Sequence, residues 1–245
     1  MKLPALTLGL ALSGMARCET VPPDMTTSPH PRAAAAAARV QPALRRDLAS
    51  AGMEFGAPVF LRAFKEEREL ELFVLQRGTA TFKLFRVYPI VAASGTLGPK
   101  LAEGDGQVPE GFYAVPPAAM NPNSSYHLSF NIGYPNAYDR SHRRTGSLIM
   151  IHGNQVSIGC LAMTDGKIEE IYTLCAAAHA GGQKFFHVHI FPFRMTGGRM
   201  DKAAGSEWEP FWENLKEGHE WFEKHRFPPD ATVRNGRYHF HEAAR

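Results

Sequence analysis

The chain has 245 residues, 44% of them hydrophobic, and a formal net charge of +3 at pH 7. This apolar content suffices for one sizeable core and does not require two large domains. Lysine and arginine are scattered along the chain, whereas a nucleic-acid-binding protein needs a dense basic stripe, so nucleic acid is excluded as a partner. Neither composition nor charge indicates an oligomeric state.

Residues 1–18 have the character of a secretory signal. Lys2 precedes an apolar run over residues 3–15, which is far shorter than the roughly 20 residues of a membrane-spanning helix. We therefore expect a cleaved signal peptide and an exported, periplasmic protein. The alternative is a lipid anchor at Cys18, although the charged Arg17 before it suits a lipoprotein signal poorly.

Residues 19–56 are rich in Pro, Thr and Ala. This composition predicts a tether, with a helical stretch over residues 40–51. From residue 58 the pattern changes, because apolar residues alternate over 59–64, 70–75 and 82–88. Three such segments with short links predict an antiparallel meander. Further strands are predicted at residues 111–115, 126–132, 147–152 and 185–191.

Residues 165–179 have the spacing of a helix, in which Ile168, Ile171, Tyr172 and Cys175 share one buried face. Ten helical residues between Asp165 and Cys175 span about 15 Å, whereas a disulfide needs Cα atoms within about 7 Å. We therefore expect Cys175 to be a core residue and Cys160 to be a free thiol.

Residues 196–245 form a predicted helical extension at the C-terminus. Ser206 and Glu209 have the spacing of a capping box, and an aromatic stripe follows until Pro228-Pro229. We expect this stripe to pack on the strands rather than to bind a ligand. Together the elements predict an α+β fold that is mainly β, with packed helices.

The densest group of chemically useful residues lies between 148 and 160. A strand delivers His152 to its end, Gly153 lets the backbone turn, and a loop with Ser157 and Gly159 returns to Cys160. A thiol needs a nearby base to become a nucleophile, and histidine is the usual one. The backbone N–H groups of Gly159 and Cys160 are candidate oxyanion donors, and the next helix is expected to lower the thiol pKa. A buried structural cysteine beside a capped histidine fits the same spacing.

Other polar residues are weaker candidates. Ser157 either donates a hydrogen bond near Cys160 or caps its own loop. Tyr126 and His127 are expected near a strand end, where they would line the cleft or, for His127, lie on a strand surface. Arg140 and Arg144, in the basic loop that also holds Arg143, would bind carboxylates of a substrate or form a solvated loop.

A zinc site is the remaining chemical alternative. His187 and His189 share a strand face and would have to meet His152 and Cys160 to complete it. The sequence has no His-Glu-x-x-His and no paired Cys-x-x-Cys spacing, so we expect no metal and no cofactor.

The sequence resembles the YkuD-type L,D-transpeptidases, and within them the YafK-like branch. The resemblance covers roughly residues 58 to 228. Beyond His152-Gly153 and Ser157-Ile158-Gly159-Cys160, it is carried by residues 64–67, 97–100, 109–113, 120–131, 133–140, 163–165 and 188–194. Long matching strings of this kind are more specific than a short motif.

The resemblance implies a mainly β catalytic domain, which we place at residues 57–195. In it Cys160 attacks a peptide carbonyl on diaminopimelate in peptidoglycan stem peptides, and His152 moves the proton. An acceptor amine would complete a transpeptidation. The alternatives are a hydrolytic amidase, which releases a wall-linked lipoprotein, and a non-catalytic wall-binding protein. Ile158 stands where the wider family has a second histidine, which leaves His152 as the only base.

Overall fold

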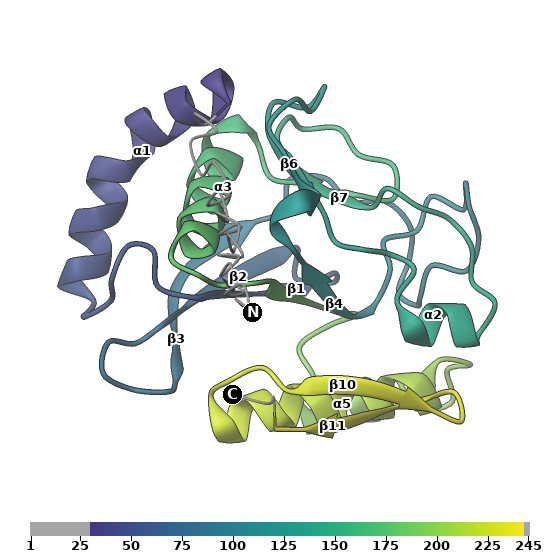
Figure 1. The fold of residues 1–245 in the computed structure, drawn as a ribbon. Coiled ribbons are helices and arrows are strands. Elements are labelled where there is room, and N and C mark those ends of the chain that lie inside the picture. The colour runs from purple at the N-terminus through teal and green to yellow at the C-terminus, as the bar shows by residue number, and fades with distance from the viewer. Residues whose placement is uncertain (1–29, 243–245) are drawn as a thin grey trace, which may run out of the picture.

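The computed structural model describes residues 30–242, and it contains a five-stranded, a four-stranded and a two-stranded sheet. Figure 1 shows the five-stranded sheet with α1 and α3 on one side, and with α5 and the two-stranded sheet on the other. The largest sheet has the order β3-β2-β1-β9-β4. Its strands are β1 (Val59–Phe64), β2 (Glu69–Leu75), β3 (Phe82–Pro89), β4 (Gly111–Val115) and β9 (Phe186–Phe191).

The meander predicted from the first three strands is confirmed, since β1–β2 and β2–β3 are antiparallel pairs. All six residues of β1 are buried, because helices cover both faces of the sheet. Leu61 belongs to the cluster that also contains Ile171 of α3 (Asp165–Ala180). Phe60, on the opposite face, packs with Phe222 of α5 (Glu209–His225).

The smaller four-stranded sheet has the order β5-β6-β7-β8 and carries the predicted catalytic residues. Its strands are β5 (Met120–Asn121), β6 (Ser129–Asn131), β7 (Met150–His152) and β8 (Leu161–Ala162). The strands predicted at 126–132 and 147–152 are present but shorter. The α+β class is confirmed. The five-stranded and four-stranded sheets are mixed, because β1–β9 and β7–β8 are parallel pairs whereas their other strand pairs are antiparallel.

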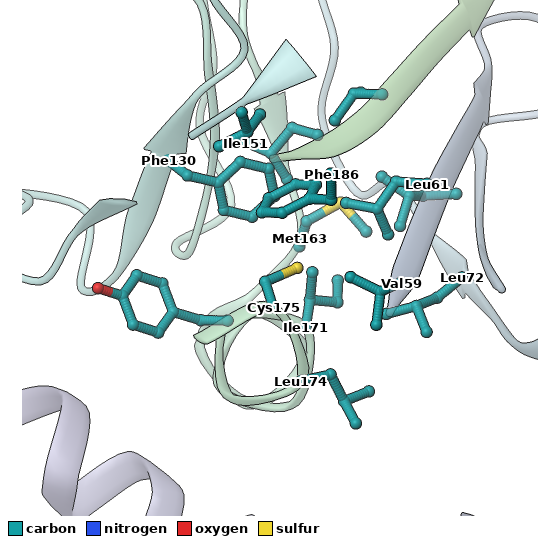
Figure 2. Close-up of a cluster of buried hydrophobic side chains, with 14 of the residues drawn as sticks. Val59, Leu61, Leu72, Phe130, Ile151, Met163, Ile171, Leu174, Cys175 and Phe186 are labelled. Atoms are coloured by element: carbon teal, nitrogen blue, oxygen red, sulfur yellow. The ribbon is translucent and has the colours of Figure 1, made fainter. Parts of the chain in front are cut away.

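The main core lies between α3 and the sheets (Figure 2). Cys175 points from α3 into this core among Ile171, Met163 and Phe186, and it is fully buried. Cys160 and Cys175 are both free thiols. The prediction that Cys175 is a core residue and Cys160 a free thiol is confirmed.

The predicted tether is wrong for much of its length, because residues Pro31–Ser50 form the long helix α1. Ala36, Leu44 and Leu48 are buried in the main core, and α1 lies beside α3 (Figure 1). Alanine side chains allow two helices to approach closely, so an Ala-rich segment need not be a linker. The predicted signal over residues 1–18 and the lipid-anchor alternative at Cys18 lie outside the described residues.

The C-terminal segment packs on the sheet as expected, although it is not purely helical. Phe211, Trp212, Leu215 and Phe222 of α5 are buried. The helix starts at Glu209 rather than at Ser206, whose hydroxyl accepts a hydrogen bond from the Trp208 N–H. A hairpin of β10 (Asp230–Arg234) and β11 (Arg237–His241) then follows, and it was not predicted.

A buried carboxylate joins this segment to the sheets. Glu110 is fully buried and accepts hydrogen bonds from Lys65 Nζ at 2.9 Å, the Gly98 N–H at 2.7 Å and Trp212 Nε1 at 2.8 Å. The remaining short helices are η1 (Pro117–Ala119), α2 (Ala137–Ser141) and α4 (Gly197–Asp201). Among residues 30–242, no helix is both long and apolar enough to cross a membrane.

Candidate active site

The parallel pairing of β7 with β8 places His152 and Cys160 on one face of the small sheet. Ile151 is opposite Leu161 and His152 is opposite Ala162, so Cys160, just before β8, is level with Met150. Side chains two residues apart share a face, and the strand spacing and rise put the two Cα atoms about 8 Å apart. Ile151 and Leu161 point to the other face, where both are buried.

His152 is held in its neutral form. Its Nδ1 lies 2.6 Å from the carbonyl oxygen of Gly153. Because a carbonyl oxygen only accepts, Nδ1 carries the proton and Nε2 is the free acceptor. Burial lowers the pKa of His152 from 6.5, although the Gly153 carbonyl partly opposes this shift. The imidazole is therefore uncharged at neutral pH.

The thiol of Cys160 is also held in its neutral form. Burial raises its pKa above 9.0, while the Met150 N–H and the charge of Lys100 act in the opposite direction. Sγ lies 3.3 Å from the Met150 nitrogen and 3.7 Å from the Leu148 oxygen. The expectation that the next helix lowers the thiol pKa is wrong, because four residues separate Cys160 from α3 at Asp165.

Two serines fix the loop that carries the thiol. Ser157 Oγ accepts the Cys160 N–H at 3.1 Å, which is the loop-capping role. Ser94 Oγ accepts the Gly159 N–H at 2.6 Å and donates to the Gly106 oxygen at 2.6 Å. Both N–H groups expected to form an oxyanion hole are therefore already bonded. Gly159 has φ +81°, a conformation that favours glycine.

A cavity of about 140 Å³ opens at Cys160 and is lined by residues from three loops. Lys100 and Glu103 come from one of them, and Leu148 and Ile158 form apolar parts of the wall. The side chain of Lys100 is buried and is held by Asp105 Oδ1 at 2.6 Å and the Ala102 oxygen at 2.8 Å. The cavity thus places a fixed positive charge near the thiol.

Tyr126 contacts His152 directly, although it does not line the cavity at Cys160. Its ring centroid is 4.8 Å from that of His152, with 35° between the planes. His127 faces away from the cleft, because its Nε2 bonds Glu169 Oε1 at 2.8 Å. It is not a strand residue either, since β6 begins at Ser129.

The two arginines predicted to bind substrate are not at the Cys160 cavity. Arg144 is buried, bonds Asp139 Oδ1 at 2.8 Å and stacks on Tyr138 and Phe211. Arg140 is exposed and lines a separate cavity of about 380 Å³. Arg140 therefore lies on the exposed side of α2 and not in a loop, whereas Arg144 has a structural role.

The zinc alternative is not supported, because its three histidines are divided between two sheets. His187 and His189 belong to β9 of the large sheet, and His152 belongs to the small one. His189 is enclosed by Phe60 and Phe112, each with a ring centroid 4.6 Å away. Within residues 30–242, no group of three or more His, Cys, Asp or Glu is arranged to bind a metal.

Two site residues were missed by sequence reasoning. Ser94 lies in a polar loop that gives no sign of its contact with Gly159, which is 65 residues away. Lys100 belongs to the segment 97–100 that resembles the family, and this resemblance alone gives it no individual role. Neither a lone serine nor a lone lysine in a loop has a sequence signal that marks it as part of an active site.

Comparison with known proteins identifies the family. Residues 64–190 match the YkuD model, the L,D-transpeptidase catalytic domain. YafK of Escherichia coli (strain K12) is 46% identical over 183 residues, which are 75% of this chain and 74% of that protein. The helical cell shape determining protein Pgp2 (K307A mutant) of Campylobacter jejuni aligns with a TM-score of 0.45 and 19% identity. That alignment covers 72% of this chain and 62% of the Pgp2 chain, which is less than two thirds of its length. The chain belongs to the YkuD family of L,D-transpeptidase catalytic domains and is a peptidoglycan-modifying enzyme.

Proposed function

We propose that this protein is a cysteine acyltransferase of the L,D-transpeptidase type, which forms a thioester on Cys160 with a diaminopimelate-containing wall peptide. The observation that carries the proposal is the pairing of β7 with β8, which presents Cys160 beside the strand that holds His152. His152 has a free Nε2 in its neutral form, and Cys160 opens onto a cavity. These are the parts that nucleophilic catalysis requires.

The chemistry starts from a neutral pair. His152 Nε2 takes the proton from Cys160 Sγ as the sulfur attacks the peptide carbonyl carbon. The C–N bond then breaks, and the departing amine takes that proton from Nε2, which leaves a thioester. In the second half, an acceptor amine gives its proton to Nε2 and attacks the thioester. The sulfur leaves and recovers the proton from His152.

The fixed charge of Lys100 supports this sequence electrostatically. A cation near the thiol stabilises the sulfur as it becomes negative and the oxyanion that follows. Lys100 is available for this role because its chain is buried in the cavity wall and its ammonium is anchored by Asp105. Tyr126 keeps water from one face of the imidazole.

The proposed substrate lies outside the cytoplasm. The apolar run over residues 3–15 fits export to the periplasm, and the partners we propose are peptidoglycan stem peptides. No cofactor enters the reaction, since each step uses a side chain and the substrate's own groups.

The test is to incubate the protein with peptidoglycan that carries covalently bound protein and to analyse the products by mass spectrometry. The products distinguish a transpeptidase, an amidase and a non-catalytic protein. New diaminopimelate–diaminopimelate crosslinks in the wild type and none with Cys160→Ala support acyl transfer to an amine. Released protein with an intact C-terminal residue and no new crosslinks would make the chain an amidase. Equal products from wild type and Cys160→Ala would leave the wall-binding alternative.

A further inference from the structure

The first turn of α1 is bonded to the loop that carries Tyr126. Arg32 Nη1 lies 2.7 Å from the carbonyl oxygen of Ser124 and 2.7 Å from that of His127. One guanidinium group thus bridges two carbonyls that flank Tyr126. Charge-assisted hydrogen bonds of this kind are stronger than those between neutral groups.

The same loop has a second attachment to the helices. Glu169 of α3 accepts hydrogen bonds from His127 Nε2 at 2.8 Å and from Arg39 Nε at 3.0 Å. Arg39 belongs to α1, so the helix holds the loop once directly and once through Glu169. His127 has φ +68°, a conformation that a non-glycine residue keeps only where its surroundings fix it.

Between these attachments, Tyr126 reaches the proposed base. Its ring lies against the imidazole of His152 in a tilted arrangement, and it is 44% exposed, so neighbouring side chains alone do not enclose it. Its carbonyl oxygen presses on Gly153, where an added Cβ would lie only 2.8 Å away. The backbone of the loop is therefore packed directly on the turn that follows His152.

We propose that α1 clamps the active site, and that Arg32 is a positioning residue which holds Tyr126 against His152 through the loop of residues 124–127. This inference rests on His152 as the base of the proposed function. Tyr126 fixes the plane of the imidazole and excludes water from one face. Arg32 itself is not among the residues that line the Cys160 cavity, so its loss should lower kcat more than it changes KM.

The direct test is a nuclear magnetic resonance measurement, which needs no substrate. The tyrosine ring current shifts the carbon-bound protons of the His152 ring, whose signals are assigned with His152→Gln. Arg32→Ala should move these signals toward their positions in Tyr126→Ala. Asp47→Ala is the matched control, because Asp47 joins α1 to Arg86 at 2.6 Å and makes no contact with the loop. It should leave the signals unchanged.

Activity provides the second readout. Arg32→Ala should lower kcat roughly 10- to 100-fold, as displaced catalytic groups do. In a Tyr126→Ala background it should have no further effect, because both changes act on one contact. If Arg32→Ala does not fold, Arg32→Lys is the second variant. It keeps the positive charge but lacks the planar guanidinium group, so it should give an intermediate shift of the His152 signals.

Two results would overturn the clamp. The first is that the His152 ring signals of folded Arg32→Ala stay at their wild-type positions. If only Arg32→Lys folds, unchanged signals in that variant count in the same way. The other is an effect of Arg32→Ala on kcat that is additive with that of Tyr126→Ala. A protein without any turnover would refute the proposed function, while the resonance measurement would still decide the clamp.

Discussion

The backbone nitrogen of Met150 lies 3.3 Å from the sulfur of Cys160, two residues before His152 on the same strand. This contact ties the thiol to the strand of the base. It is also one of two influences that favour the thiolate, the other being the charge of Lys100. Burial outweighs both, because the pKa of Cys160 is still raised above 9.0.

The first prediction concerns the reactivity of that thiol. Because its pKa is raised, iodoacetamide should alkylate Cys160 slowly at pH 7, and the rate should rise steadily with pH and still be rising at pH 9. Lys100→Met should slow the reaction at a fixed pH, since loss of the positive charge raises the pKa further. Lys184→Met, an exposed control outside the cavity, should not. Peptide-level mass spectrometry separates Cys160 from the buried Cys175, and fast alkylation at pH 7 would contradict the prediction.

The second prediction concerns the acid limb of the activity profile. His152 must be neutral to accept a proton, and burial lowers its pKa below 6.5. Activity should therefore be lost as pH falls through that lowered pKa, with the midpoint of kcat/KM below pH 6.5. His152→Gln should lower kcat/KM by about 10²- to 10⁴-fold. A midpoint above pH 6.5, or a flat profile from pH 5 to 9, would argue against this base.

The third prediction compares Gly153, in the turn after β7, with Gly166, in the first turn of α3. A Cβ at Gly153 would lie 2.6 Å from Asp165 Oδ1 and 2.8 Å from the Tyr126 oxygen, whereas Gly166 has nothing within 4 Å. Gly153→Ala should cost about 1–3 kcal/mol of unfolding free energy and lower activity. Gly166→Ala, in α3, should gain up to about 1 kcal/mol. Urea unfolding measures both, and equal effects would mean that the loop does not pack on Gly153.

The fourth prediction tests the hydrogen bond by which Trp212 of α5 attaches the C-terminal helix to the buried Glu110. Trp212→Phe removes the donor that bonds Glu110 at 2.8 Å and leaves a buried carboxylate oxygen without it. The expected cost is about 1–3 kcal/mol. Trp221→Phe is the matched control, because Trp221 Nε1 has no hydrogen-bond partner among residues 30–242. Similar losses from both variants would show that ring volume, and not the hydrogen bond, stabilises the contact.

Local patterns in the sequence predicted the parts of the fold that local physics determines. Alternation gave β1, β2 and β3 nearly to the residue, and 3.6-residue spacing gave α3. The hairpin β10–β11 was missed although Asn235-Gly236, with φ of +50° and +69°, is its turn, and this dipeptide is a strong hairpin signal. Misreading α1 had a different cause, since Ala36, Leu44 and Leu48 become core residues only where α1 packs on the fold.

The residues of the candidate site likewise fall into those that local sequence predicts and those that only the fold brings together. His152 and Cys160 were found because their spacing and neighbours are visible in one segment. Ser94, Lys100 and Arg32 come from segments distant in sequence, and only the folded chain brings their contacts together. Arg144 was misassigned because its partner Asp139 is buried in the fold, which turns a basic loop residue into a structural one.

The most direct test of the central claim is intact-protein mass spectrometry during turnover of a diaminopimelate-containing wall peptide. We expect a transient adduct whose mass equals the acyl part of the substrate, located on the peptide that contains Cys160. Hydroxylamine should remove it, as it does a thioester, and Cys160→Ala should not form it. Product formation by Cys160→Ala at the wild-type rate would contradict the account.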